Sequence, residues 1–291
     1  MTDPQLWLSA LEIGCFFGLL ALSYYLILIG SGFFNFALGP YAMVGGLSAS
    51  WFIVNLGWPP ILAALVGVLL VVAVSAVTEL VVVRPVQKKS GRGELPALVA
   101  VAAVLFAVQQ AAGVAFGRVP LPGVRLVEGS PIELGDVYLF PTSALLIGVT
   151  LVAFIGVGLW MSKSTTGRLL RAVGDNGDAA RILGLPVSRV RLVSFMLGGL
   201  LAGVAGVLFS SKSGISFQAG LGWTLTGFLA LVIGGTGRIY APLIGGLILG
   251  IVQVFTPFYF ATLGPQTMIL FLGVIFFAFK PEGIFVRKVR A

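Results

Sequence analysis

The chain has 291 residues, of which 58% are hydrophobic and only 10% are charged, and its net charge at pH 7 is +8. Soluble domains carry roughly 25% charged residues, so this composition excludes a water-soluble globular protein. The sequence has no histidine and one cysteine, Cys15, which excludes imidazole-based metal sites and general bases, and a disulfide within the chain.

Apolar runs of about 20 residues recur along the chain, and this length crosses a hydrocarbon core of about 30 Å. Such unbroken runs predict an all-α fold, a polytopic membrane helix bundle of eight or nine segments, because a membrane β-barrel would show short alternating strands. The whole chain, 1–291, is therefore interpreted as a single transmembrane domain. We expect membrane segments at 6–30, 34–55, 60–83, 95–116, 144–162, 193–210, 223–235, 240–257 and 267–280.

Two of these segments, 6–30 and 223–235, differ from a typical membrane span. The first apolar run is too long, and too weakly basic at its start, for a cleaved signal peptide. Segment 223–235 has about 13 residues, which is short for a span, so a re-entrant or tilted element is expected there.

The first two apolar segments each contain a strongly polar residue near one end, Glu12 and Asn35. Glu12 lies near the outer end of its segment, where it would either reach the surface or line the mouth of a path. Asn35 lies at a helix boundary, at the start of the second segment, and Gly30, Gly32 and Gly39 around it permit a break in the helix. A broken membrane helix offers free backbone N–H groups to a substrate carboxylate. The alternative is that Asn35 only caps the second helix at the membrane surface.

Further polar residues lie at the end of the third segment and within later ones. The carboxylate of Glu79 precedes Arg84 and Pro85, which predicts a structural ion pair with Arg84 and an end of the helix at the proline. Gln110 and Gln253 are neutral polar groups in apolar segments, as is Gln109 next to the former. Such groups either join helices by hydrogen bonds or line a path.

The basic residues are divided unequally between the two sides of the predicted membrane. Fifteen of the 18 Lys and Arg fall on one side, in regions 84–94 and 163–192, at Arg238 and in the tail from Lys280. This bias predicts that this side and the C-terminus are cytoplasmic and that the N-terminus faces outward. The positive charge therefore sets orientation and does not predict nucleic-acid binding. The longest loop on the outer side, 117–143, is either a docking site for a delivering partner or a connector.

Residues 163–192 are the largest feature on the predicted cytoplasmic side. Apolar residues recur three and four apart, with Asp175 or Asn176 available as a cap between two runs, which predicts two short amphipathic helices. Gly184 predicts the end of the second helix, and Ser188 a cap for the next membrane helix. Helices this short need a cover for their apolar faces, either a docked cytoplasmic partner or anionic lipid. The apolar residues are Leu169, Leu170, Val173, Ala179, Ile182 and Leu183.

The sequence contains no means of using ATP by itself. A phosphate-binding loop needs G-x-x-x-x-G-K-[ST], and the nearest stretch, "MSKS" at 161–164, lacks the glycines. A nucleophile with its base and a cluster of metal ligands are also missing, so the chain is not expected to be an enzyme or to hold a metal or cofactor. A transport subunit driven by other proteins fits these observations. A self-sufficient secondary transporter or channel is the alternative, although it would need buried acids in mid-membrane.

Six motifs, taken in chain order, resemble the H-type permease subunit of branched-chain amino acid ABC transporters, within a wider family that includes ribose-type and urea-type permeases. They cover nearly the whole chain, and their order is that of the family. They are "GFFNFALG" (32–39), "ELVVVRPV" (79–86), "GRLLRAVGDNGDAARILGLPVSRVRLVSF" (167–195), "GGLLAGVAGVL" (198–208), "IGGTGRIYAPLIGGLILG" (233–250) and "KPEGIF" (280–285).

The resemblance implies a permease subunit in a bacterial inner membrane, with no cofactor of its own. Its implied partners are cytoplasmic ATP-binding subunits, a second homologous permease subunit, an extracytoplasmic solute-binding protein and the lipid bilayer. The implied substrate pathway includes Asn35, Phe36, Gly39, Tyr41, Gln110 and Gln253. The implied ATPase-coupling residues are Arg168, Arg171, Asp178, Ala179, Ile182, Leu183 and Gly184.

The sequence departs from the family's pattern at a few positions near the Asn35 motif. Leu38 stands where family members usually carry histidine, and Pro40 stands where an acidic residue often follows. The expected cargo is therefore a small polar solute, with branched-chain or other amino acids first and urea, amides or another small solute as the alternative.

Overall fold

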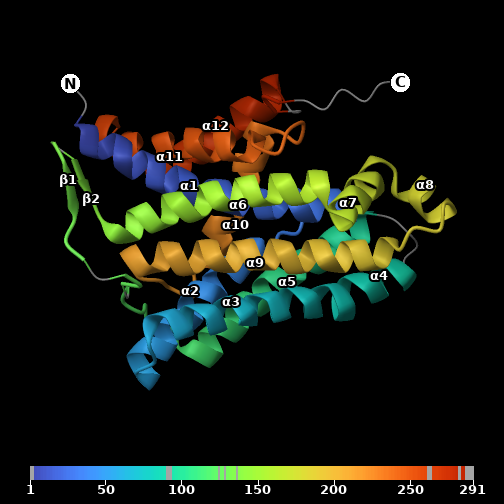
Figure 1. Cartoon of the computed structure of the whole chain (residues 1–291), viewed down its shortest axis with the longest axis horizontal. Helices are drawn as coiled ribbons and strands as arrows, with labels where there is room; N and C mark the ends of the chain where they lie inside the picture. The colour runs from blue at the N-terminus through green and yellow to red at the C-terminus, as the bar shows by residue number, and fades with distance from the viewer. Residues whose placement is uncertain are drawn as a thin grey trace.

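The computed structural model describes residues 3–89, 94–123, 125–127, 129–135, 137–260, 264–280 and 283–285. Most long helices run side by side along one axis (Figure 1). A hairpin of β1 (Ile132–Leu134) and β2 (Val137–Leu139) lies at one end, the hairpin end. The short helices α7 and α8 lie at the other, the α7–α8 end. The helices are α1 (Pro4–Ser31), α2 (Leu38–Leu56), α3 (Pro60–Val77), η1 (Thr78–Val83), α4 (Arg84–Lys89), α5 (Glu94–Phe116), α6 (Pro141–Lys163), α7 (Thr165–Asp175), α8 (Gly177–Ile182), α9 (Val187–Ser213), α10 (Ala219–Gly234), α11 (Ala241–Tyr259) and α12 (Pro265–Phe279).

The prediction of an all-helical, multi-pass membrane protein is confirmed. Within the described ranges, six helices are long and apolar enough to cross a membrane. Two shorter apolar helices, α10 and α12, have 16 and 15 residues. At 1.5 Å per residue, α10 extends over about 24 Å and falls short of a hydrocarbon core of about 30 Å. The six are α1, the continuous helix Pro60–Lys89, α5, α6, α9 and α11.

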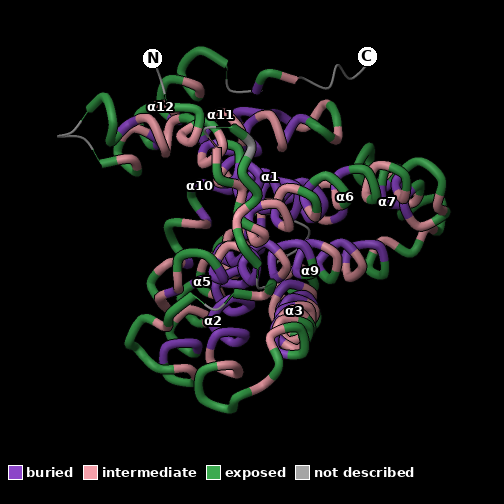
Figure 2. The backbone as a smooth tube through the Cα atoms, turned by 60° about the vertical axis from the view of Figure 1, so that its left-hand side comes forward, coloured by how far each residue is buried: buried purple, intermediate pink, exposed green. Residues whose placement is uncertain are grey.

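The centre of the bundle is formed by α1 and α9, which are buried along most of their length (Figure 2). Glycines let α1 and α11 touch at the level of the backbone. A Cβ atom at Gly246 would lie 2.4 Å from the amide nitrogen of Gly18, and one at Gly250 would lie 2.4 Å from the carbonyl oxygen of Ala10. Small residues replace apolar side chains here because close van der Waals packing is what holds helices together in lipid.

Two groups of three helices are arranged alike but run in opposite directions: α1, α2 and α3, and α9, α10 and α11. Helices α1 and α9 are antiparallel, because Glu12 pairs with Lys212 near one end and Gly30 lies against Ser194 near the other. As α1 packs on α11, so α9 packs on α3. The segments that lead into α2 and α10 also share a sequence pattern, "SGFFNFALG" (31–39) and "SGISFQAG" (213–220). The bundle thus contains an inverted repeat, an arrangement common among membrane transporters.

The third predicted segment is longer than expected. Pro85 was expected to end it, and this prediction is wrong, because the helix continues from α3 through η1 and α4 to Lys89. The η1 segment is π-helical, and the Arg84 N–H bonds to the Glu79 carbonyl five residues back. This wider turn removes the clash that a proline ring makes with the preceding turn of an α-helix.

Candidate functional site

The middle of the bundle contains a junction where α2 and α10 begin. Their first turns face each other: a Cβ atom at Gly39 would lie 2.2 Å from the Gly220 carbonyl oxygen. The Tyr24 hydroxyl, in the interior of α1, donates to the Thr224 carbonyl oxygen at 3.2 Å, so the junction lies well inside the bundle. Because both helices begin here, the positive ends of their dipoles converge on one region.

Asn35 lies at this junction and is fully buried. Its Oδ1 atom accepts a hydrogen bond from the Ala37 N–H at 3.0 Å. Its Nδ2 atom has no hydrogen-bond partner among the described residues. Asn35 thus holds the turn that leads into α2, and it does so from a position that is buried in the protein. An unpaired amide donor in an apolar interior costs free energy, which is expected where a ligand or a second conformation supplies the partner.

Three other residues of the predicted pathway lie beside Asn35. Gly39 makes the close contact between α2 and α10 described above, and the Phe36 carbonyl accepts a hydrogen bond from the Thr224 hydroxyl at 2.9 Å. The Tyr41 hydroxyl is buried and donates to Thr78 Oγ1 at 2.7 Å. Tyr41 therefore connects the start of α2 to the π-helical segment η1.

The three glutamines lie in different surroundings. Gln110 is exposed on the surface of α5 and does not reach the junction. Gln253 is half-buried on α11, beyond Gly250, which packs against the first turns of α1. Gln109 is the glutamine at the junction: its buried Oε1 atom has no partner in the part of the chain that the structure describes. A Cβ atom at Gly220 would lie 3.1 Å from that oxygen. The sequence does not separate Gln109 from Gln110, because the rotation of α5 decides which one points inward.

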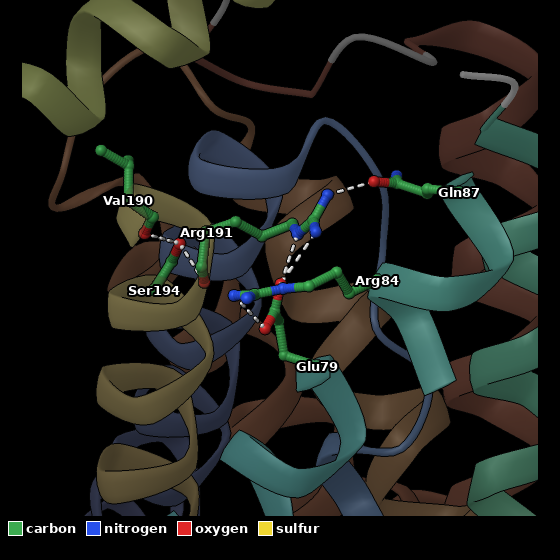
Figure 3. A network of polar contacts seen from close by, with 6 residues as sticks. All are labelled: Glu79, Arg84, Gln87, Val190, Arg191 and Ser194. Atoms are coloured by element: carbon green, nitrogen blue, oxygen red, sulfur yellow. Dashed lines mark hydrogen bonds and ion pairs between the residues drawn. The ribbon is translucent and has the colours of Figure 1, made fainter. Parts of the chain in front are cut away.

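A buried ion network lies toward the α7–α8 end (Figure 3). Glu79 is fully buried, and its Oε2 atom accepts from Arg84 Nη2 at 3.0 Å. Its Oε1 atom accepts from Arg191 Nε at 2.8 Å. Arg191 also donates to Gln87. One carboxylate thus serves two guanidinium groups, and the network joins η1 and α4 to the first turns of α9.

Arg191 was not expected in this network. It lies 112 residues from Glu79 in the sequence, and a single sequence gives no sign of such a contact. The sequence did indicate that Glu79 needs a partner, because an acid within an apolar segment requires a compensating charge. Arg84 alone is 30% exposed in its side chain, whereas Arg191 is only 8% exposed. Arg191 therefore provides the buried part of the compensation.

The predicted pair of short amphipathic helices is α7 and α8. Ser164 caps α7 by accepting from the Gly167 N–H at 3.1 Å, and Asn176 caps α8 by accepting from the Ala179 N–H at 2.9 Å. Gly184 follows α8 with a φ of 74°, a conformation that favours glycine. The predicted cap at Ser188 is wrong, because α9 begins at Val187 without a side-chain cap.

The apolar faces of these helices have different surroundings. On α7, Leu170 is 1% exposed and Val173 is 6% exposed, against α1, α6 and α9. On α8, Ala179 is half-buried but Ile182 is 86% exposed, and Leu183, the residue that caps the end of α8, is 77% exposed. Arg168 is exposed, and Arg171 donates to the Met161 carbonyl oxygen at 2.5 Å. The side chain of Asp178 lies outside the described residues.

The hairpin end contains a second buried acid. Glu12 is 3% exposed and pairs with Lys212 on α9, so it does not extend to the surface. The β1–β2 hairpin is held to α1 by Gln5, whose Oε1 atom accepts from the Tyr138 N–H at 2.9 Å. Leu121 pairs with Ile215 in the segment before α10. The loop 117–143 therefore touches the bundle at these two points, while most of its described residues are exposed.

Comparison with known proteins agrees with this arrangement. A family described as branched-chain amino acid transport system / permease component matches residues 8–279. The chain is 27% identical over 300 residues to the high-affinity branched-chain amino acid transport system permease protein LivH of Escherichia coli K12, covering 97% of this chain and 95% of that protein. It is 27% identical over 298 residues to BraD of Pseudomonas aeruginosa, with the same coverage. It is 34% identical over 197 residues to the ribose import permease protein RbsC of E. coli K12, covering 54% of this chain and 60% of that protein.

Proposed function

The chain belongs to the family of branched-chain amino acid transport system permease components, and we propose that it is the membrane subunit of an importer powered by separate ATPase subunits. As a member of a transport permease family it is not an enzyme. The two acids that are buried among the described residues support this proposal over a self-sufficient transporter. Glu12 is neutralised by Lys212, and Glu79 by Arg84 and Arg191. Neither acid lies at the central junction, where proton or cation coupling would use one.

The proposed cargo is an amino acid, with branched-chain amino acids first. The observation that carries this proposal is coverage: similarity to LivH and BraD extends over 97% of the chain, whereas similarity to RbsC extends over 54%. The junction supports it chemically, because two helix N-termini and the Asn35 amide present N–H donors that suit a carboxylate. Urea, amides and sugars are the competing cargoes.

We propose that the substrate pathway passes the junction formed by Asn35, Phe36, Gly39 and Tyr41. The unpartnered Nδ2 atom of Asn35 and Oε1 atom of Gln109 supply one donor and one acceptor there. Gln110 is proposed to face a second, homologous permease subunit, since it is exposed on α5 and an amide facing lipid is unfavourable. Gln253, which lies nearer the hairpin end, is proposed for the outer part of the same pathway.

We propose that α8 is the surface on which an ATPase subunit docks. Its exposed Ile182 and Leu183 provide anchors of the kind that enter a groove in a partner protein. Gly184 then directs the chain into α9. Ala179 and Asp178 belong to the same short helix and are proposed as part of this docking surface. Arg168 and Arg171 lie on α7 and are proposed to set the register of the docked subunit. With this assignment the α7–α8 end and the C-terminus are cytoplasmic.

The proposed outer partner is a solute-binding protein at the hairpin end, on the loop 117–143. The loop is packed on α1 through Gln5 and on the segment before α10 through Leu121. A protein that docks on this loop would thus contact the segment that leads into the junction. The proposed location is a bacterial inner membrane, as implied by the relatives.

The test is ATP-dependent uptake by the purified assembly. The tagged chain is isolated from its native membrane with the subunits that co-purify, reconstituted in liposomes and supplied with radiolabelled leucine, ribose or urea. We expect ATP-dependent uptake of leucine by the assembly and neither uptake nor ATP hydrolysis by the chain alone. Uptake of ribose or urea without leucine would contradict the cargo. Uptake by the chain alone without ATP would contradict the importer itself.

A further inference from the structure

A cavity of about 620 Å³ lies between α4, the end of α8 and the start of α9. Its wall carries four basic side chains, and none of the described side chains that line it is acidic. Leu185, Pro186 and Val187 form an apolar part of the same wall. The polar side chains are Arg84, Gln87, Lys88, Arg181, Ser188 and Arg191.

The cavity carries net positive charge after internal pairing is taken into account. Arg84 and Arg191 share the single carboxylate of Glu79, which leaves one positive charge between them. Lys88 is exposed and forms no ion pair with the other described residues. Guanidinium and ammonium groups arranged in this way bind the oxygen atoms of a phosphate group.

The cavity also lies at the level expected for lipid headgroups. About 20 helical residues cross the hydrocarbon core, so the continuous helix that begins at Pro60 reaches the far boundary near Leu80. Arg84 and Lys88 lie about 6 and 12 Å further along the helix axis, at 1.5 Å per residue. This distance places both side chains in the headgroup region.

An exposed apolar surface leads directly to the basic residues. Val77 and Val81 are 54% and 65% exposed. Arg84 and Lys88 follow on the same helix, about one and two turns beyond Val81; Arg84 turns to the buried Glu79, whereas Lys88 is exposed. A phospholipid whose acyl chains lie on Val77 and Val81 would have its phosphate at Arg84 and Lys88.

We propose that this cavity binds the phosphate of an anionic phospholipid headgroup. Arg84, Lys88 and Arg191 bind the phosphate oxygens, and Ser188 offers a hydroxyl to the headgroup. The adjoining cavity, of about 290 Å³, has Asp175 on its wall and is therefore not included. The proposal depends on the chain lying in a membrane and not on its cargo or its ATPase partners.

A lipid is favoured over two other sources of negative charge. Free phosphate would not use the apolar surface that ends at Arg84. An acidic side chain of a protein docked on α8 would approach from the exposed side of Ile182 and Leu183, whereas the apolar surface at Val77 and Val81 leads to the cavity from the membrane.

Native mass spectrometry of the purified, full-length permease tests this site directly. The protein is exchanged into equal amounts of phosphatidylglycerol and phosphatidylcholine with identical acyl chains, and the ratio of the two bound lipids is measured. We expect phosphatidylglycerol to predominate, and Lys88→Gln to lower its ratio about tenfold, the factor for the loss of one hydrogen bond between charged groups. The matched controls Lys89→Gln and Arg189→Gln, which remove the same charge outside the cavity wall, should leave the ratio unchanged.

Three results would overturn the proposal. One is an equal ratio of the two lipids in the wild type, and another is an equal loss in Lys88→Gln and in both controls, which would indicate only general surface charge. The third is displacement of phosphatidylglycerol by inorganic phosphate or by the bound ATPase subunits, which would assign the cavity to a soluble anion or to a protein. A lowered ratio with unchanged leucine uptake would support the lipid site independently of the proposed function.

Discussion

Helices α7 and α8 are neighbours in one loop, yet their apolar residues have opposite surroundings. Leu170 and Val173 on α7 are buried against the bundle, whereas Ile182 and Leu183 on α8 are exposed. Both helices have side-chain caps and similar sequence patterns, so periodicity alone does not separate them. The difference shows that α7 is part of the permease core, and that α8 is the part of the loop available to another molecule.

The different surroundings of α7 and α8 have a mechanical consequence. Helix α8 leads through Gly184 into α9, where Arg191 is fixed to Glu79. Next to Glu79, Thr78 accepts the hydrogen bond from Tyr41 at the start of α2. A movement of α8 would therefore be transmitted through a short series of contacts to the junction of α2 and α10.

The largest loss of stability is expected for a substitution on the buried face of α7. Leu170→Asp places a carboxylate where a side chain is 1% exposed. We expect a loss of about 3–5 kcal/mol, from the lost apolar packing and the unpaired buried charge. The measurement is the yield of folded permease by size-exclusion chromatography after membrane extraction. Normal yield would show that α7 does not belong to the core.

The ion network should give the next largest effect. Glu79→Gln leaves Arg191 buried without its carboxylate, and breaking such a pair costs about 3–5 kcal/mol. Arg84→Gln should cost less, because the Arg84 side chain is 30% exposed. Thermal unfolding in detergent measures both.

A double variant tests whether the cost comes from the unpaired charge. Glu79→Leu combined with Arg191→Met should recover most of the stability that Glu79→Gln loses, because an apolar pair replaces the buried charges. Equal loss in the single and double variants would show that the network does not act through the Glu79–Arg191 pair.

The smallest effect on folding is expected for a substitution at the exposed end of α8. Leu183→Asp should leave the amount and thermal stability of the permease unchanged, since this side chain is 77% exposed. If α8 docks in a groove of an ATPase subunit, the variant should weaken that contact by about 1–3 kcal/mol or more. Co-purification of ATPase with the tagged permease is the readout.

Arg168→Gln is the comparison on α7: it removes an exposed charge proposed to set the register and leaves the apolar face of α8 unchanged, so we expect it to weaken the ATPase contact less than Leu183→Asp does. A larger loss of ATPase from Arg168→Gln than from Leu183→Asp would favour the alternative in which the loop lies on anionic lipid through its charge.

Much of the fold could be predicted from the sequence because membrane helices are specified locally. Length and hydropathy predicted the segments, and Asn176 and Gly184 indicated the ends of α8. The continuation through Pro85 could not be predicted, since a π-helical turn depends on packing around Thr78 and Glu79. The Glu79–Arg191 pair is a long-range contact, and the choice between Gln109 and Gln110 depends on the rotation of α5. These are properties of tertiary packing, which a single sequence does not contain.

The central claim, that the α8 end of the loop meets the ATPase, is tested most directly by site-specific cross-linking. In a Cys15→Ser background, single cysteines are introduced by Leu183→Cys on α8 and by Ser213→Cys, an exposed position at the hairpin end. A short thiol-to-amine cross-linker is added to inverted membrane vesicles that contain the whole assembly. We predict a covalent adduct between permease and ATPase for Leu183→Cys and none for Ser213→Cys. An adduct for Ser213→Cys with none for Leu183→Cys would contradict both the docking surface and the proposed orientation.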